Sequence, residues 1–110
     1  MVEGEAAIRV VVFLSEEDRH HHRALHEVLL DRARELGVIG ATVWRGIEGF
    51  GASGDVRTTR FPDVDLGLPL MLEVIDRPET VERFIASVIE LAPDSMITRE
   101  PIELFGGRAR

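Results

Sequence analysis

Glycine is concentrated in one stretch of the chain, residues 37–54, which read GVIGATVWRGIEGFGASG and hold six of the ten glycines. A glycine inside a strand or helix costs about 0.5–1 kcal/mol relative to alanine, so this density needs a reason. If another molecule approaches the backbone closely, Gly49 and Gly51 would let main-chain N–H groups reach an anion, while Phe50 offers an apolar surface. The alternative is a strained edge strand and loop without a ligand.

Arginine could supply the charge that an anionic ligand needs. The sequence contains no lysine, so every basic side chain apart from histidine is an arginine. A planar guanidinium can bind phosphate or carboxylate through two parallel hydrogen bonds. By their placement along the chain, we predict that Arg57, Arg60 and Arg99 pair with the ligand. The alternative for each is an ordinary solvated arginine or an ion pair with one of three nearby acids: Asp55, Asp63 and Glu100.

Four histidines fall within DRHHHRALHE: His20, His21, His22 and His26. A helix would place His22 and His26, four residues apart, on one face, which suggests a metal site. Two nitrogen ligands do not complete such a site unless Asp18 or another subunit contributes, and a polar helix entrance is the alternative.

The neighbouring acids Glu16 and Glu17 are interpreted as favourable charges at the positive end of that helix, not as a general acid and base. No nucleophile with a plausible base is present. We therefore expect no catalytic residue, no metal and no cofactor.

Composition excludes several other functions. Without cysteine the chain can form neither a disulfide nor a thiolate metal site, and without lysine or tyrosine it lacks a Walker lysine, a Schiff base and a modifiable tyrosine. The net charge of −7 disfavours nucleic acid. The longest apolar runs are much shorter than the roughly 18 residues of a membrane span, and the acidic N-terminus is unlike a signal peptide. We expect a cytoplasmic protein without membrane insertion.

Hydrophobic periodicity predicts six main elements. In chain order they are strand 6–14, helix 23–36, strand 40–50, strand 68–75, helix 78–92 and strand 95–104. The order β-α-β-β-α-β predicts an α+β ferredoxin-like sandwich, in which a four-stranded antiparallel sheet carries two helices on one face. That topology places the first and third strands in the middle, and these are the two most apolar strands. The fourth strand contains Pro101, which suits an edge.

One face of this sheet is left open by the two helices, so we expect self-association through it, with Trp44 in a subunit interface. Residues 51–67 show no periodicity and predict a long mobile loop. We predict one domain over residues 1–110, with a flexible tail at 106–110.

A family resemblance narrows the choice of ligand. GVIGATV followed by GFG resembles the PII signal-transduction superfamily, in which a Gly-x-x-Gly-x-Thr-Val strand runs into Gly-Phe-Gly at the base of a long loop. GATVWRGIEGFGASG together with LPLMLEVIDRPETVERF is more similar still to the PII-like family called domain of unknown function 190, over about residues 7–104. The resemblance implies a homotrimer that holds small ligands, typically adenine nucleotides, in clefts between subunits. It implies that Thr42 lies beside the base and that Gly49, Phe50 and Gly51 shape the cleft wall.

Two features of nucleotide-binding PII proteins are missing here. ELAPDSMITRE stands where they have a Gly-Asp-Gly-Lys loop, and the long loop lacks the tyrosine that is uridylylated. The resemblance then implies a smaller phosphate load, such as AMP or ADP, or a different ligand.

The predicted function is a regulatory trimer that senses a small ligand and presents residues 52–67 to a partner protein such as a transporter. Two alternatives remain. One is a trimeric metal-tolerance-like protein that uses the His20–His26 cluster, and the other is a small cofactor-free ferredoxin-like enzyme with His26 or Trp44 in its pocket.

Overall fold

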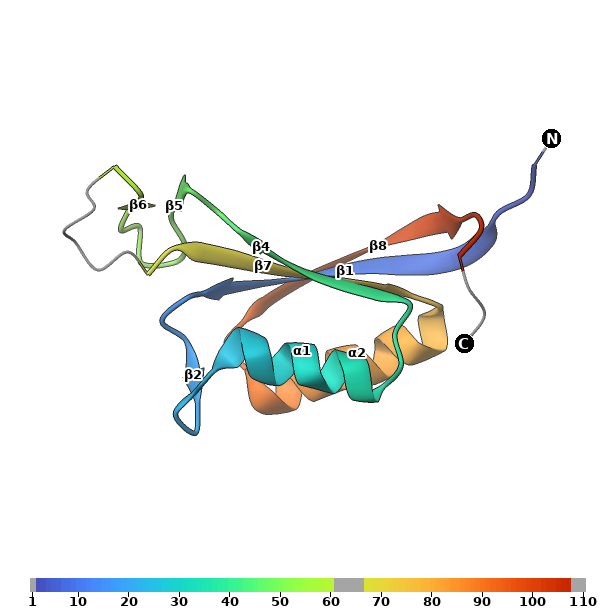
Figure 1. Cartoon of the computed structure of the whole chain (residues 1–110), viewed down its shortest axis with the longest axis horizontal. Coiled ribbons are helices and arrows are strands. Elements are labelled where there is room, and N and C mark those ends of the chain that lie inside the picture. Colours follow the sequence, from blue (N-terminus) through green and yellow to red (C-terminus); the bar gives the residue numbers. More distant parts are fainter. Residues whose placement is uncertain (1, 61–66, 108–110) are drawn as a thin grey trace.

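A four-stranded antiparallel sheet and two helices on one of its faces make up the computed structural model, which describes residues 2–60 and 67–107 (Figure 1). Across the sheet the strands are β4 (Gly40–Arg45), β7 (Pro69–Asp76), β1 (Glu5–Ser15) and β8 (Met96–Leu104). The helices are α1 (Leu25–Glu35) and α2 (Pro78–Leu91). The predicted ferredoxin-like fold is confirmed, with the two apolar strands β1 and β7 in the middle and Pro101 in an edge strand.

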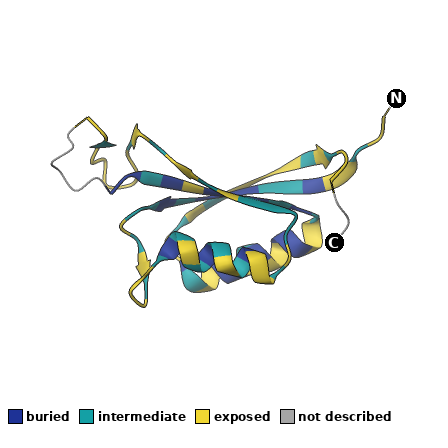
Figure 2. Ribbon diagram, in the orientation of Figure 1, coloured by how far each residue is buried: buried dark blue, intermediate teal, exposed yellow. Residues whose placement is uncertain are grey.

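The hydrophobic core fills the space between the sheet and the helices. Successive side chains of a strand point to opposite faces, so every second residue of β1 and β7 enters this layer. α2 contributes Phe84, the largest fully buried side chain, and both helices turn their buried side toward the sheet (Figure 2). The strand residues of the core are Val10, Val12, Leu14, Leu70, Leu72 and Val74.

The helix predicted from residue 23 begins later, at Leu25. A two-stranded hairpin of β2 (Arg19–His20) and β3 (Arg23–Ala24) precedes it. The residues at the hairpin turn, His21 and His22, have φ values of 47° and 71°, which are incompatible with a right-handed helix. The prediction that His22 and His26 share one helical face is therefore wrong.

The strand predicted over residues 40–50 is interrupted after Arg45. Gly46 donates a hydrogen bond to the Pro69 carbonyl at 2.8 Å, but Pro69 has no N–H with which to continue the ladder. The chain then forms β5 (Glu48–Gly49), which pairs with β6 (Arg57–Thr58) in a separate sheet. The segment 51–67, predicted as a loop throughout, thus contains a short strand.

Parts of two predictions lie outside the described residues. These are residues 61–66 of the long loop, including Asp63, and residues 108–110 of the predicted tail. Among the residues that the structure describes, no helix is long and apolar enough to cross a bilayer.

The face of the sheet opposite the helices, which we call the open face, carries a row of large apolar side chains. The strand register aligns Trp44, Met71, Phe13 and Met96 across all four strands. Trp44 is 53% exposed and Met96 is 60% exposed. Further along the same face, Arg9 forms ion pairs with Glu73 and Glu100, both at 2.8 Å.

Candidate functional site

The β5–β6 ladder brings three of the predicted site residues together. Gly49 lies opposite Arg57, and Thr59 N–H donates to the Ile47 carbonyl at 3.1 Å. Arg60 follows directly, and its side chain forms an ion pair with Glu48 and donates to Thr58 Oγ1. We call β5, β6, the turn Ser15–Asp18 and residues 67–68 the loop base.

Phe50 and Gly51 follow β5 and are open to solvent. Phe50 is 72% exposed, and Ile47 beside β5 is 74% exposed, so apolar side chains lie close in sequence to the arginines of the loop base. Gly51 has a φ outside the left-handed region, and a Cβ on it would have no described neighbour within 4 Å. Nothing within the described chain therefore requires glycine at position 51, whereas a Cβ at Gly46 would lie 2.9 Å from Pro69 Cγ.

Two other predicted residues lie apart from the loop base within one chain. Thr42 is exposed on the open face of β4, opposite Glu73. Arg99 lies on β8, at the opposite edge of the sheet, and its guanidinium forms an ion pair with Glu82 of α2. A single subunit does not bring Arg99 to the glycine-rich stretch.

The turn Ser15–Asp18 is fixed by local hydrogen bonds. Asp18 N–H donates to the Ser15 carbonyl at 3.1 Å, and Ser15 N–H donates to Asp18 Oδ2 at 2.9 Å. The first of these bonds closes a four-residue turn, in which serine is favoured at the first position. The two bonds leave the two residues between, Glu16 and Glu17, free to point their side chains outward.

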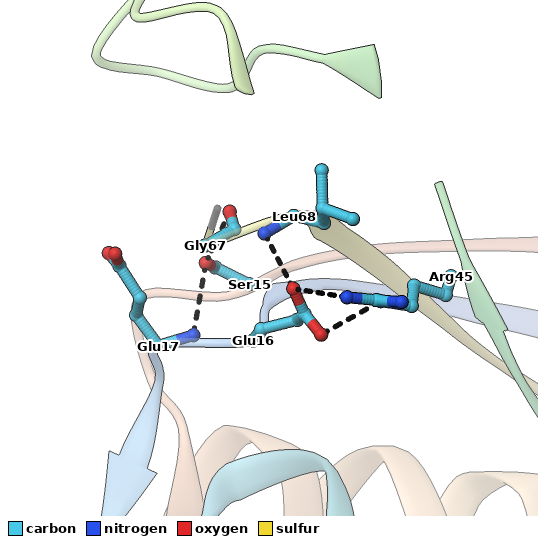
Figure 3. A network of polar contacts seen from close by, with 6 residues as sticks. All are labelled: Ser15, Glu16, Glu17, Arg45, Gly67 and Leu68. Carbon is cyan, nitrogen blue, oxygen red and sulfur yellow. Dashed lines mark hydrogen bonds and ion pairs between the residues drawn. The ribbon is translucent and has the colours of Figure 1, made fainter. Parts of the chain in front are cut away.

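Glu16 connects the end of β4 with the residue that precedes β7 (Figure 3). Its carboxylate accepts a hydrogen bond from Leu68 N–H at 2.9 Å and pairs with Arg45 Nε at 2.8 Å. Glu16 N–H in turn donates to the Leu68 carbonyl at 3.0 Å. The end of β4 and the start of β7 are thereby held against the turn that follows β1.

Electrostatics favour the ionised form of Glu16. Burial raises the pKa of this carboxyl, but the bonds from Leu68 N–H and Arg45 outweigh burial, and the pKa lies below its ordinary value. The interpretation of Glu16 as a helix cap is wrong, because no side chain caps the N-terminus of α1 and the hydrogen-bond partners of Glu16 are Arg45 of β4 and Leu68, which precedes β7.

Glu17 is placed by a glycine on the far side of the loop. A Cβ on Gly67, whose φ of +45° favours glycine, would lie 2.6 Å from Glu17 Cδ, so the Glu17 side chain in this position uses the space that the glycine leaves. The Glu17 carboxylate lies 3.5 Å from Arg57 Nη1. Glu17 is also not a helix-end charge, and Arg57 is paired with a different acid from those the sequence suggested.

The histidines do not assemble a metal site in the described part of the chain. No group of three or more histidine, cysteine or acidic side chains that could hold a metal is present among those residues. The consecutive residues His20 and His21 contact each other edge to face at the turn of the hairpin, with ring centroids 4.3 Å apart. His26 lies in the first turn of α1, half-buried.

Comparison with known proteins identifies the family. The model of DUF190, described as Uncharacterized ACR, COG1993, matches residues 7–104. The chain belongs to the DUF190 family. A UPF0166 protein of Aquifex aeolicus (strain VF5) is 33% identical over 94 residues, covering 86% of this chain and 89% of that protein. The UPF0166 protein MJ1524 of Methanocaldococcus jannaschii is 26% identical over 80 residues, 73% of each chain.

A solved structure connects this DUF190 member with PII-like proteins. CPII, a nitrogen regulatory PII-like protein from Thiomonas intermedia K12, was solved bound to ADP, AMP and bicarbonate. It matches with a TM-score of 0.67 at 18% identity, over 98% of this chain and 94% of that chain. The likeness shows that the two proteins share a fold, and the family match confirms the predicted resemblance to the domain of unknown function 190 family.

Proposed function

We propose that this DUF190 protein is a cytoplasmic PII-like regulator. It binds an adenine nucleotide, such as AMP or ADP, in clefts between the subunits of a homotrimer. The observation that carries the proposal is the fold shared over nearly the whole chain with CPII, a protein solved with ADP and AMP. The proposal assigns the protein a binding role without catalysis.

The loop base supports this ligand class by its chemistry. Arg57 and Arg60 each hold a carboxylate, so their guanidinium groups are placed to bind oxyanions. The exposed Phe50 can cover an apolar ring, as an adenine base requires. At Gly51 the absence of any described neighbour around a Cβ fits a position reserved for the close approach of a ligand.

The proposed trimer supports the site with residues that one chain keeps apart. Its subunits would meet through the open face, where Trp44, Met71 and Met96 are exposed. In this arrangement Thr42, on the same face, reaches the base of the nucleotide, and Arg99 comes from a neighbouring subunit. Residues 52–67 are then presented to a partner protein such as a transporter. Ligand binding to the trimer thereby regulates that partner.

Calorimetric titration with ADP and AMP tests the proposal on the wild type and on Gly51→Ala. We expect the wild type to bind and Gly51→Ala to lose binding, because the added methyl group occupies the path of the ligand to the backbone. The thermal midpoint should not fall, since the methyl meets nothing in the described chain.

Gly40→Ala is the matched control. Gly40 also has open space around a Cβ, but it begins β4, whereas the loop base lies beyond the other end of that strand. Its affinity should equal that of the wild type. Equal nucleotide affinity in Gly51→Ala and wild type would show that position 51 is not part of the binding site, and absence of binding in the wild type would refute the nucleotide proposal.

A further inference from the structure

Two adjacent glutamates at the loop base differ in how closely their carboxylates contact their partners. Glu16 holds a backbone N–H and a guanidinium, both at 2.9 Å or less, and its side chain is 30% exposed. Glu17 is 45% exposed and reaches Arg57 only at 3.5 Å. Exposed ion pairs of this kind contribute little, about 0.2–1 kcal/mol, so Glu17 can leave its partner easily whereas Glu16 is anchored.

The position of Glu17 is nevertheless built into the chain. The turn fixes its backbone, because Glu17 N–H donates to Ser15 Oγ at 3.2 Å, and the same hydroxyl donates to the Gly67 carbonyl (Figure 3). The missing side chain at Gly67 provides the space in which the Glu17 carboxyl group lies. The carboxylate is thus directed to Arg57 from another part of the fold.

We propose that Glu17 is a built-in competitor of the anionic ligand: its carboxylate occupies Arg57 in the free protein and leaves when a phosphate group binds there. This inference rests on the proposed function, because it assigns Arg57 to the ligand site. Glu16 keeps its contacts during the exchange, so the ends of β4 and β7 stay in place.

The exchange selects ligands by charge. A phosphate group carries up to two negative charges and three acceptor oxygens, whereas the carboxylate that it displaces carries one charge and two oxygens. A phosphate therefore interacts more strongly with Arg57 than the Glu17 carboxylate does, whereas a ligand with a single carboxylate only exchanges one carboxylate for another. Competition by Glu17 thus favours ligands with more than one negative charge.

Glu17→Gln tests the inference, because it removes the charge and keeps the shape of the side chain. Calorimetric titration with ADP at low ionic strength should give an affinity about two- to five-fold higher than that of the wild type, the range expected from one exposed ion pair. The gain should shrink as salt is added, because salt screens exposed charges.

A double-mutant cycle assigns the effect to the pair. Arg57→Gln should weaken ADP binding, and adding Glu17→Gln to it should bring no further gain, because the competitor then has no cation to occupy. Glu79→Gln is the control for net charge. It removes one exposed acid in the first turn of α2, beyond the opposite end of β7 from the loop base, and should leave the affinity unchanged.

The outcomes separate the two proposals. Equal ADP affinity in the wild type and Glu17→Gln refutes the competitor and leaves nucleotide binding intact. A gain that persists in the Arg57→Gln background, or that Glu79→Gln reproduces, also refutes it, because it would then be a general charge effect. If none of the proteins binds ADP, the proposed function fails and the inference fails with it.

Discussion

The two faces of the sheet differ in how far one chain completes them. On the helix-covered face Val10, Val12 and Leu72 are fully buried. On the open face, in the same strands, Met71 is 39% exposed and Arg9 pairs with two acids that also contact solvent. The comparison teaches that alternate residues of one strand have different surroundings: one set packs against the helices, and several of the other set stay in contact with solvent.

The largest expected effect concerns the helix-covered face. Phe84→Ala removes the largest fully buried side chain, and we expect the free energy of unfolding to fall by about 3–5 kcal/mol, because a cavity replaces the ring. Chemical denaturation of the variant measures this loss.

Met71→Ala is the matched substitution on the open face. Because Met71 is exposed, this substitution should lower the free energy of unfolding of the single chain by less than about 1 kcal/mol. Comparable losses for Phe84→Ala and Met71→Ala, measured at protein concentrations where both are monomers, would contradict the distinction between a complete and an incomplete face.

The fold was largely predictable from the sequence because its signals are local and repeated. Alternation in β1 and β7 and the helical spacing of Val81, Phe84 and Val88 each recur over several residues. The break after Arg45 is not predictable from local sequence, because it depends on Pro69, which becomes a neighbour only when β4 and β7 pair.

The candidate site was predictable only in part. The glycines and arginines could be named from motif and residue type, but their partners could not. Glu16 meets Leu68 across 52 positions of sequence, and no periodicity connects them. Ser15 suits the first position of a turn, but Ser-x-x-Asp is equally the pattern of a helix N-terminus, so the local sequence does not separate the two.

An intermediate effect on the free energy of unfolding is expected at the loop base, whose contacts depend on charge. The pKa of Glu16 is lowered on folding, so its ionised carboxylate stabilises the folded chain above the unfolded-state pKa, and this contribution is lost as the pH falls through the lower folded-state pKa. We expect Glu16→Gln to remove this part of the acid dependence, on the order of 1 kcal/mol, in urea titrations at pH 7 and in mild acid. An unchanged difference between the two pH values would show that the Glu16 contacts do not contribute to stability.

The smallest effect on the single chain should come from Met71→Arg, which is nevertheless the most informative about the open face. An arginine at this exposed position can extend into solvent and should change the stability of one subunit by about 0.5 kcal/mol or less. In a trimer that buries the row of Trp44 and Phe13, three guanidinium groups would lose their hydration without partners, so the assembly should dissociate. Light scattering should report the mass of one chain, 12.3 kDa, and the thermal midpoint should become independent of protein concentration.

Ile89→Arg adds the same charge on the outer side of α2 and should leave the trimer intact. If Met71→Arg and Ile89→Arg behave alike, the subunits do not meet through the open face, and the exposed row there needs another occupant.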